Sequence, residues 1–536
     1  MKNIKEYTIV KIMMLAMLVG LMITGCKKNE NENLEPPRIF KPGEVSISAG
    51  ETSAKLKWVE PIFSEGKPLT YTVDFSTDDA FTTIAYTKVV DTAGITVTDE
   101  NLQTRTPYYA RIKANAYQDQ PESKYMFSEA FQITGLQLFD AVDEDDLTRT
   151  GATLRFTATT GLTSIVLKPT TGATVTVPLT AGDAAAGLKA ITGLTAQTAY
   201  TATLMLGTRS VGFVEFTTLA PLPTGADVVT LTATDDLAAM IQAATASTRF
   251  VLLQGTQYNS DATVLLPAGI DISIIGEAGP VKPIVSLSLI TLPTTGGKLH
   301  FENVDVTGYA NGNAATTKRQ YLINQGTAST MEEISFENCD IRNFANTPFR
   351  LQGSNAITIN KLIVNRCFIK DVGVNGTNGT YAFINTNTAS GKFNNIALTN
   401  STFVEIGYGL IVHNSAPSVT VAIENNTFYN VIGNGRYLID YSTQVVSSSY
   451  TFKSNIIGKT YAPANTGRGM RGGTTPVAES NYLTSDATIS ANPIPQITNY
   501  SGTSLDLFTD PATDNFKIKD NTFAGRSSVG DPRGRL

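Results

Sequence analysis

The 536-residue sequence predicts an all-β protein in which two small β-sandwiches precede a right-handed parallel β-helix with an N-terminal capping helix. From Asn303 onward, an Asn followed three residues later by a bulky apolar residue returns about every 25 to 35 residues, as in a solenoid. Short runs of alternating polarity fill each repeat, and none of the repeats holds an amphipathic stretch of helical length. The same alternation marks two shorter modules upstream, which predicts strands there as well.

The N-terminus has basic, apolar and cleavage-site segments in the order typical of a secretion signal. Three lysines precede an apolar stretch from Ile12 to Ile23, which is too short to favour a membrane-spanning helix. The sequence ITGC, ending at Cys26, then resembles the bacterial lipobox, in which the cysteine becomes the lipidated first residue. We therefore expect a lipoprotein signal peptide over residues 1–25 and a membrane contact through lipid on Cys26.

Residues 26–36 are polar and rich in Asn, Glu and Lys, so they cannot bury a core and should form a flexible tether. Acidic residues just after the lipidated cysteine resemble the export signals of surface lipoproteins in Gram-negative glycan foragers. This resemblance implies a lipid anchor in the outer membrane and exposure at the cell surface.

The first module covers residues 37–134. Its sequence AKLKW alternates up to Trp58, the only Trp of the chain, which we expect in the core. Leu102 stands six residues before Tyr108, and this spacing resembles the tyrosine corner of fibronectin type III domains. The second module, residues 135–220, repeats the spacing with Leu194 and Tyr200 but lacks a Trp.

The β-helix is expected over residues 226–536. An amphipathic stretch, LAAMIQAAT, follows Asp235 and Asp236 and predicts the capping helix, with Thr234 or Asp235 as N-cap. The strand and Gly-turn pattern that comes next resembles the entry of a pectate-lyase-like β-helix. That fold is shared by many carbohydrate-active proteins, so the resemblance implies a fold more than a chemistry.

Aligning the repeats predicts two columns of stacked side chains. An inner apolar column should contain Val306, Ile341, Phe368, Phe403 and Phe428. A column of amides that satisfy turn backbone groups should contain Asn303, Asn338, Asn365, Asn400 and Asn425, with Ser454 and Ser480 in the same register. In this alignment Cys339 and Cys367 point to opposite faces, which argues against a disulfide.

Charge narrows the choice of partner. The chain carries 41 Lys and Arg against 47 Asp and Glu, a net charge of −6, so a nucleic-acid partner is not expected. The repeat region carries nearly equal numbers of basic and acidic residues, so a locally basic groove is compatible with its composition. Guanidinium groups bind carboxylates and aromatic rings stack on sugars, so we expect one groove for a uronic-acid chain. Its predicted ligand-binding residues are Arg342, Arg350, Tyr408, His413, Arg436 and Tyr437.

A lyase would in addition need a base and a cation. Arg366 and Lys370 are the candidate bases for β-elimination from a uronate. Asp305 and Asp340 are the candidate ligands of a calcium ion, the cofactor such chemistry would use, although the following coils supply no further carboxylate. No pair of acids suits hydrolysis.

Two stretches near the C-terminus stand out. The sequence GRGMRGG, residues 467–473, predicts a flexible Gly-rich loop, either one that clamps an anion or one that crosses the end of the tube. The sequence from Gly530 to Arg533 resembles the ending of β-helix lipoproteins encoded in polysaccharide-utilisation clusters.

These observations predict a surface lipoprotein that binds an acidic, pectin-like plant polysaccharide for glycan capture and utilisation. Association with other outer-membrane glycan-uptake proteins would fit that role. Two alternatives stay open: a pectate-type lyase with the same fold and ligand, and an adhesin that binds host protein or mucin.

Overall fold

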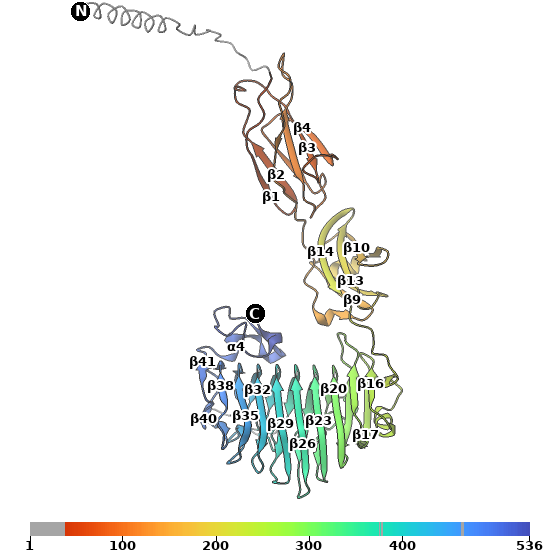
Figure 1. The fold of residues 1–536 in the computed structure, drawn as a ribbon, viewed down its shortest axis with the longest axis vertical. Helices are drawn as coiled ribbons and strands as arrows, with labels where there is room; N and C mark the ends of the chain where they lie inside the picture. The colour runs from red at the N-terminus through yellow and green to blue at the C-terminus, as the bar shows by residue number, and fades with distance from the viewer. Residues whose placement is uncertain (1–37, 375, 377–378, 463–465) are drawn as a thin grey trace, which may run out of the picture.

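The computed structural model describes residues 38–374, 376, 379–462 and 466–536. Figure 1 shows two small β-sandwiches followed by a long stack of parallel strands. The predicted signal peptide, the lipidation site at Cys26 and the tether lie outside the described residues. None of the helices in the described ranges is long and apolar enough to cross a bilayer.

The first sandwich packs a three-stranded antiparallel sheet against a four-stranded one. Trp58 lies in its core, only 5% exposed, with Tyr71 edge-on at 5.3 Å. The tyrosine corner is confirmed, because the Gln103 N–H donates to the Tyr108 hydroxyl at 3.2 Å. In sheet order the strands are β1 (Val45–Ala49), β2 (Ser53–Trp58) and β5 (Gly94–Thr98), then β4 (Tyr86–Val90), β3 (Tyr71–Ser76), β6 (Tyr109–Ala114) and β7 (Met126–Phe127).

The second sandwich has the same two-sheet plan and its own apolar core. Its tyrosine corner is also present, with the Thr195 N–H donating to the Tyr200 hydroxyl at 2.9 Å. The two sheets are β12 (Leu188–Thr192), β9 (Gly151–Arg155) and β8 (Leu147–Thr148), and β11 (Val175–Pro178), β10 (Leu162–Pro169), β13 (Ala199–Leu206) and β14 (Arg209–Thr217). Two short helices, η1 (Glu144–Asp146) and α2 (Ala181–Ala186), complete it.

The rest of the chain is a parallel β-helix with three faces. The first face is a ten-stranded parallel sheet: β15 (Val228–Leu231), β16 (Thr248–Leu252), β18 (Ile272–Gly276), β20 (Thr295–Glu302), β23 (Ser329–Glu337), β26 (Ile357–Asn365), β29 (Gly391–Thr399), β32 (Ser418–Glu424), β35 (Val446–Lys453) and β38 (Val477–Glu479).

The other two faces belong to one continuous seventeen-stranded sheet that contributes two strands per coil. Its entry strands are β17 (Gln257–Leu265) and β19 (Ile284–Thr291). The second face contains β21 (Asp305–Thr307), β24 (Asp340–Phe344), β27 (Phe368–Val372), β30 (Thr402–Ile406), β33 (Thr427–Val431), β36 (Ile456–Ile457), β39 (Asn481–Leu483) and β41 (Ile497–Asn499). The third face contains β22 (Ile323–Gln325), β25 (Phe349–Leu351), β28 (Ile384–Thr386), β31 (Ile411–His413), β34 (Tyr437–Asp440), β37 (Gly467–Arg471) and β40 (Ile489–Ala491).

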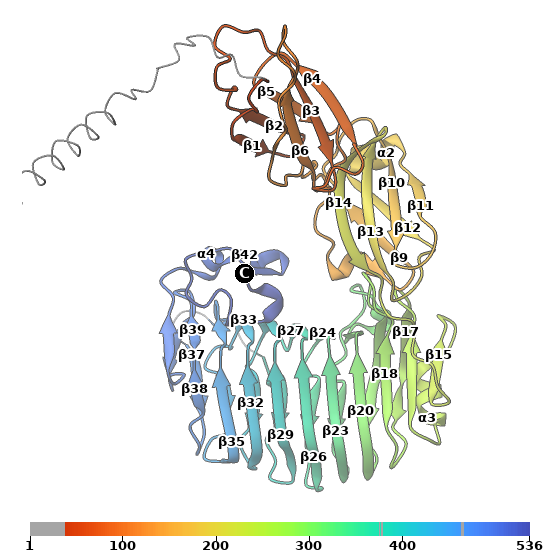
Figure 2. The same ribbon diagram turned by 45° about the horizontal axis from the view of Figure 1, so that its top comes forward.

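The capping helix is present as α3 (Leu237–Ala243), at the end of the β-helix that begins with β15 (Figure 2). Its N-cap is Asp236, one residue later than expected, because this carboxylate accepts from the Ala239 N–H at 3.0 Å. Leu237 and Ile241 are buried in the main core, so the helix closes the first coil against water.

The inner apolar column is confirmed except at one coil. In register it runs through Val306, Ile341, Ile369, Phe403, Phe428 and Ile457, all buried. The prediction of Phe368 was wrong: Phe368 pairs with Asp340 and Thr402 in the outward column. A one-residue error in register exchanges the two faces of a strand, and the alignment on Asn365 caused that error.

The turn between the first and second faces explains the Asn repeat. The turn residue has φ between 51° and 58° at Asn303, Asn338, Arg366, Asn400, Asn425, Ser454 and Ser480. Asn tolerates this left-handed conformation better than most residues, so it recurs there. At the third coil the turn residue is Arg366 and not Asn365.

The buried ladder of amides runs one position after these turn residues. Asn455 lies at its centre: its Nδ2 donates to Asn481 Oδ1 at 3.0 Å, and its Oδ1 accepts from the Asn426 N–H at 3.0 Å. Cys339 and Cys367 belong to the same inner column, and the Cys339 N–H points at Cys367 Sγ at 3.4 Å. The prediction that the two cysteines face opposite sides was therefore wrong; both are buried free thiols.

A C-terminal segment folds back onto the second face. It contains α4 (Ser504–Leu507), β42 (Phe508–Asp510), η3 (Pro511–Thr513), β43 (Asn515–Ile518) and η4 (Pro532–Gly534). Asp531 anchors it, since the Thr402 hydroxyl donates to this buried carboxylate at 2.8 Å. Arg533 adds a bond from its guanidinium to the Cys367 carbonyl at 2.9 Å.

Candidate ligand-binding surfaces

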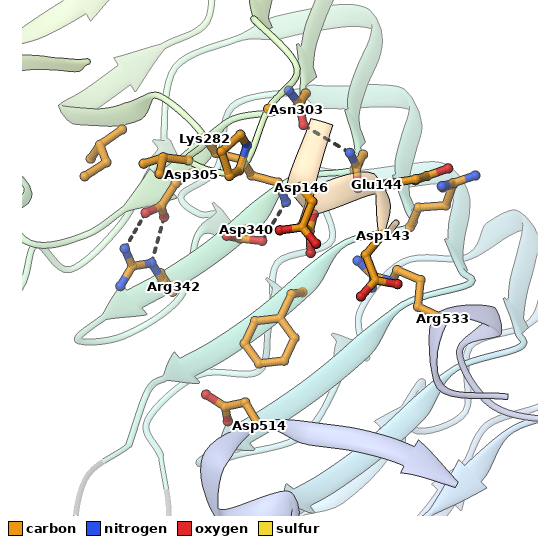
Figure 3. Close-up of a pocket in the computed structure, with 18 of the residues that line it drawn as sticks. Asp143, Glu144, Asp146, Lys282, Asn303, Asp305, Asp340, Arg342, Asp514 and Arg533 are labelled. Atoms are coloured by element: carbon orange, nitrogen blue, oxygen red, sulfur yellow. Dashed lines mark hydrogen bonds and ion pairs between the residues drawn. The ribbon is translucent and has the colours of Figure 1, made fainter. Parts of the chain in front are cut away.

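A groove of about 960 Å³ is lined by residues of the second face, the second sandwich and the C-terminal segment. Figure 2 shows how these three parts of the chain are arranged. The floor carries outward side chains of β21, β24 and β27, and η1 forms one wall (Figure 3). An ion pair between Arg149 and Glu277, 2.9 Å, ties the sandwich to the first coils. Binding sites commonly lie at boundaries between domains. The charges inside the groove determine which ligands it could bind.

Most charges on the floor are already paired with one another. Arg342 forms a two-bonded ion pair with Asp305, Nε to Oδ1 being 2.7 Å, and Lys282 pairs with Asp340 at 2.8 Å (Figure 3). Burial raises the pKa of Asp305, while the neighbouring Arg342 guanidinium opposes that shift. The groove therefore presents compensated charge and not a free cationic surface.

This pairing argues against the predicted calcium site and against Lys370 as a base. Asp305 and Asp340 stack in register as expected, but each carboxylate is held by a cationic side chain. Lys370 donates to both carboxylate oxygens of Asp514, at 2.8 and 2.7 Å, so its amine is not directed into open space. Among the described residues, no group of three or more His, Cys, Asp or Glu side chains is placed to hold a metal ion.

A second surface runs along the third face and alternates arginine with tyrosine. The Arg350 guanidinium lies over Tyr381, 4.5 Å from the ring centre, and the Arg436 guanidinium lies over Tyr408 at 4.5 Å. We call this surface the Arg–Tyr strip; it consists of Tyr321, Arg350, Tyr381, Tyr408, Arg436, Tyr437, Arg468 and Arg471. Except for buried Tyr437, its side chains are half-buried, so they lie flat on the surface.

The strip follows from the register of the coils. Asn324, Arg350, Asn385, Val412, Asp440 and Arg471 form one outward column from β22 to β37. Six coils at the usual strand spacing make this column about 24 Å long. Its only carboxylate is Asp440, which Arg471 binds with two hydrogen bonds at 2.9 and 2.7 Å. Four guanidinium groups against one carboxylate leave the strip basic.

The strip also holds polar atoms that have no partner. Five buried side-chain N or O atoms among the described residues make no hydrogen bond; two of them belong to arginines of the strip and two to asparagines of the adjoining outward column. They are Asn324 Oδ1, Arg350 Nε, Asn385 Nδ2 and Arg436 Nε. Buried polar groups are nearly always paired, so this concentration is unusual, but each of these atoms is shielded from solvent and a ligand would meet the outer guanidinium N–H groups instead.

In a comparison with known protein families, one family model matches part of the β-helix. Residues 421–533 match a family described as a domain of unknown function, DUF5123. That match covers the last coils and most of the C-terminal segment. No curated protein matches the chain.

Two solved structures are similar to it in part. A two-domain fibronectin type III segment of chicken tenascin is 16% identical, covers 33% of this chain and 97% of its own, and gives a TM-score of 0.18. The FN1–FN3 domains of chicken CNTN1 are 14% identical; the match covers 34% of this chain and 65% of that structure, with a TM-score of 0.16. The assignment of the sandwiches depends on the strand order and tyrosine corners described above.

The predicted ligand-binding residues do not line one groove. Arg350, Tyr408, Arg436 and Tyr437 belong to the strip, whereas Arg342 lies in the groove on the second face, as does the candidate base Arg366. Sequence spacing assigned each residue to a coil but not to a face.

His413 was predicted wrongly as a ligand-binding residue. It is fully buried, its Nε2 accepts from the Phe393 N–H at 3.0 Å, and its Nδ1 contacts the Ala416 carbonyl at 2.7 Å. Burial lowers its pKa to about 4, so the ring is a neutral part of the core.

The stretch GRGMRGG was also misread. Residues Gly467–Arg471 form the strand β37, and both of its arginines lie over the Tyr437 ring, at 5.2 and 4.4 Å. Tyr321 and Tyr381 were missed altogether. The signal that would have found them is their common offset, two or three residues before third-face strands.

Proposed function

We propose that this protein is a cell-surface lipoprotein that binds an acidic, pectin-like polysaccharide along the Arg–Tyr strip. The observation that carries the proposal is the set of four guanidinium groups that lie over tyrosine rings and make this surface basic. Guanidinium N–H groups suit carboxylate and hydroxyl oxygens. The tyrosines add ring faces on which sugar rings stack.

The length of the strip fits a polymer better than a small molecule. Arginines recur along about 19 Å, at positions from β25 to β37, so several charged units of one chain would be bound at once. The sequence ITGC at Cys26 supports lipid anchoring, and the acidic tether supports display at the outer-membrane surface. Other outer-membrane glycan-uptake proteins would be natural partners for such a capture protein.

The geometry favours capture over cleavage. The predicted bases, Arg366 and Lys370, are on the second face, away from the strip, and Lys370 is engaged by Asp514. A lyase would need its base beside the bound uronate, within hydrogen-bonding reach of the proton.

The test uses the chain from Lys27 onward, which keeps every described residue. Affinity electrophoresis in gels containing polygalacturonate measures binding, and absorbance of unsaturated products measures elimination. We expect retardation without a rise in absorbance. A rise in absorbance would show that the protein is a lyase and not only a capture protein. Absence of both signals would refute the proposal.

A further inference from the structure

One end of the first sandwich exposes a cluster of large apolar side chains. Val59, Ile62 and Phe63 are 63%, 63% and 72% exposed, and Phe40 is 39% exposed. The ring centres of Phe40 and Phe63 lie 5.8 Å apart, so these two rings pack against each other. We call these four residues the apolar tip. Exposed apolar patches rimmed by polar residues mark interaction surfaces.

The backbone at the tip is also unusual. Phe63 has a φ of 61°, in the left-handed region that a bulky residue adopts only at an energetic cost. Strain of this kind is retained where the position of a side chain matters for function. Here it holds an aromatic ring out in solvent, where it contributes nothing to the core.

The tip points away from the rest of the molecule. In the β1–β2 hairpin, Val45 pairs with Trp58 at the tip end and Ala49 pairs with Ala54 at the opposite end. The second sandwich attaches at that opposite end, where the Arg209 guanidinium binds Asp99 at 2.7 Å. Figure 1 likewise shows the start of the described chain at the end farthest from the β-helix.

The tip lies beside the point where the tether begins. Phe40 is two residues after Arg38, the first described residue, and the chain from Cys26 to Arg38 cannot span more than about 40 Å. A lipid on Cys26, which is part of the proposed function, would therefore keep the tip near the bilayer. Arg38 and Lys41 are exposed there beside Glu60 and Glu65, so local charge is balanced and apolar contact must drive any docking.

We infer that the apolar tip inserts into the lipid bilayer interface and stands the molecule upright on the membrane. Aromatic and aliphatic side chains that enter the boundary between headgroups and acyl chains leave water for an apolar environment, which is favourable. The sandwiches then hold the Arg–Tyr strip outward, toward a polymer too large to approach the membrane.

The experiment exploits the single Trp of the chain, Trp58, which adjoins Val59. The chain from Cys26 onward is coupled through that thiol to a maleimide phosphatidylethanolamine in vesicles of brominated phosphatidylcholine. Cys339 and Cys367 are buried and will not react. Because bromine quenches only at short range, we expect Trp58 fluorescence to be quenched in the wild-type protein and quenching to be lost in the double variant I62S/F63S.

The control variant L265S/V477S removes two aliphatic side chains of the β-helix that are 57% and 62% exposed, and it should be quenched like the wild type. An unquenched wild type, or equal loss in the control, would overturn the inference. Polygalacturonate binding is measured on the same samples and should be unchanged in I62S/F63S. Binding without quenching would refute the docking alone, and quenching without binding would refute the proposed ligand alone.

Discussion

Replacing Arg436 by Ala should weaken polygalacturonate binding by about 10- to 100-fold. The half-buried Arg436 guanidinium lies 4.5 Å over the Tyr408 ring. A hydrogen bond to a charged partner contributes about 1.5 to 3 kcal/mol, and each 1.4 kcal/mol is about a factor of ten in affinity. The affinity of Arg436→Lys should lie between those of the wild type and R436A, because lysine keeps the positive charge but lacks the planar set of donors of the guanidinium group.

Calorimetric titration with polygalacturonate fragments measures these affinities. Arg366→Ala is the matched control, since Arg366 lines the groove on the second face and is outside the strip. Rising salt should weaken wild-type binding more than binding by R436A, because one charge contact has been removed. Equal losses in R436A and R366A would refute the assignment of binding to the third face.

Three further predictions concern stability. Burial lowers the pKa of His413 to about 4, below the ordinary value near 6.5, so the unfolded chain takes up a proton between these pH values and the native protein does not. The free energy of unfolding should therefore fall by up to about 3 kcal/mol as the pH drops through that window, and H413Q should lose this dependence. Urea unfolding at several pH values measures it, and the same pH dependence in the wild type and H413Q would contradict the prediction. Asn455→Leu should cost about 2 kcal/mol or more, because it leaves the Asn426 N–H unpaired and removes the bond from Asn455 Nδ2 to the Ile423 carbonyl, whereas exposed Asn434→Leu should be nearly neutral in the same unfolding assay. Phe63→Gly should raise stability by about 1 kcal/mol by relieving the left-handed φ of 61°, while lipid quenching of Trp58 falls; a lower melting temperature would contradict this.

The fold was predictable where its signals are local. Tyr108 and Tyr200 stand at fixed spacings from a Leu, and each hydroxyl bonds to a nearby backbone N–H, so the corners are visible in sequence. The repeat was visible because a left-handed turn favours Asn once per coil. The exception, Arg366, shows the limit: packing of Ile369 into the inner column sets the register, and a neighbouring Asn365 misled the alignment.

The candidate site was less predictable because it depends on which face each strand forms. Arg342 and Arg350 are eight residues apart, yet the corner between β24 and β25 sends them to different faces. His413 was misplaced because alternation puts its neighbour Val412 in the outward column. Arg468 and Arg471 were placed on a loop because Gly is common in turns, although here glycines are part of β37.

A crystal structure with a bound oligogalacturonate would show whether the Arg–Tyr strip is the binding site. We expect sugar carboxylates within hydrogen-bonding distance of Arg350 and Arg436, with sugar rings against Tyr381 or Tyr408 and the oligosaccharide running along the β-helix axis. An oligosaccharide seated instead in the groove beside Arg342 and Asp340, with the strip empty, would contradict it.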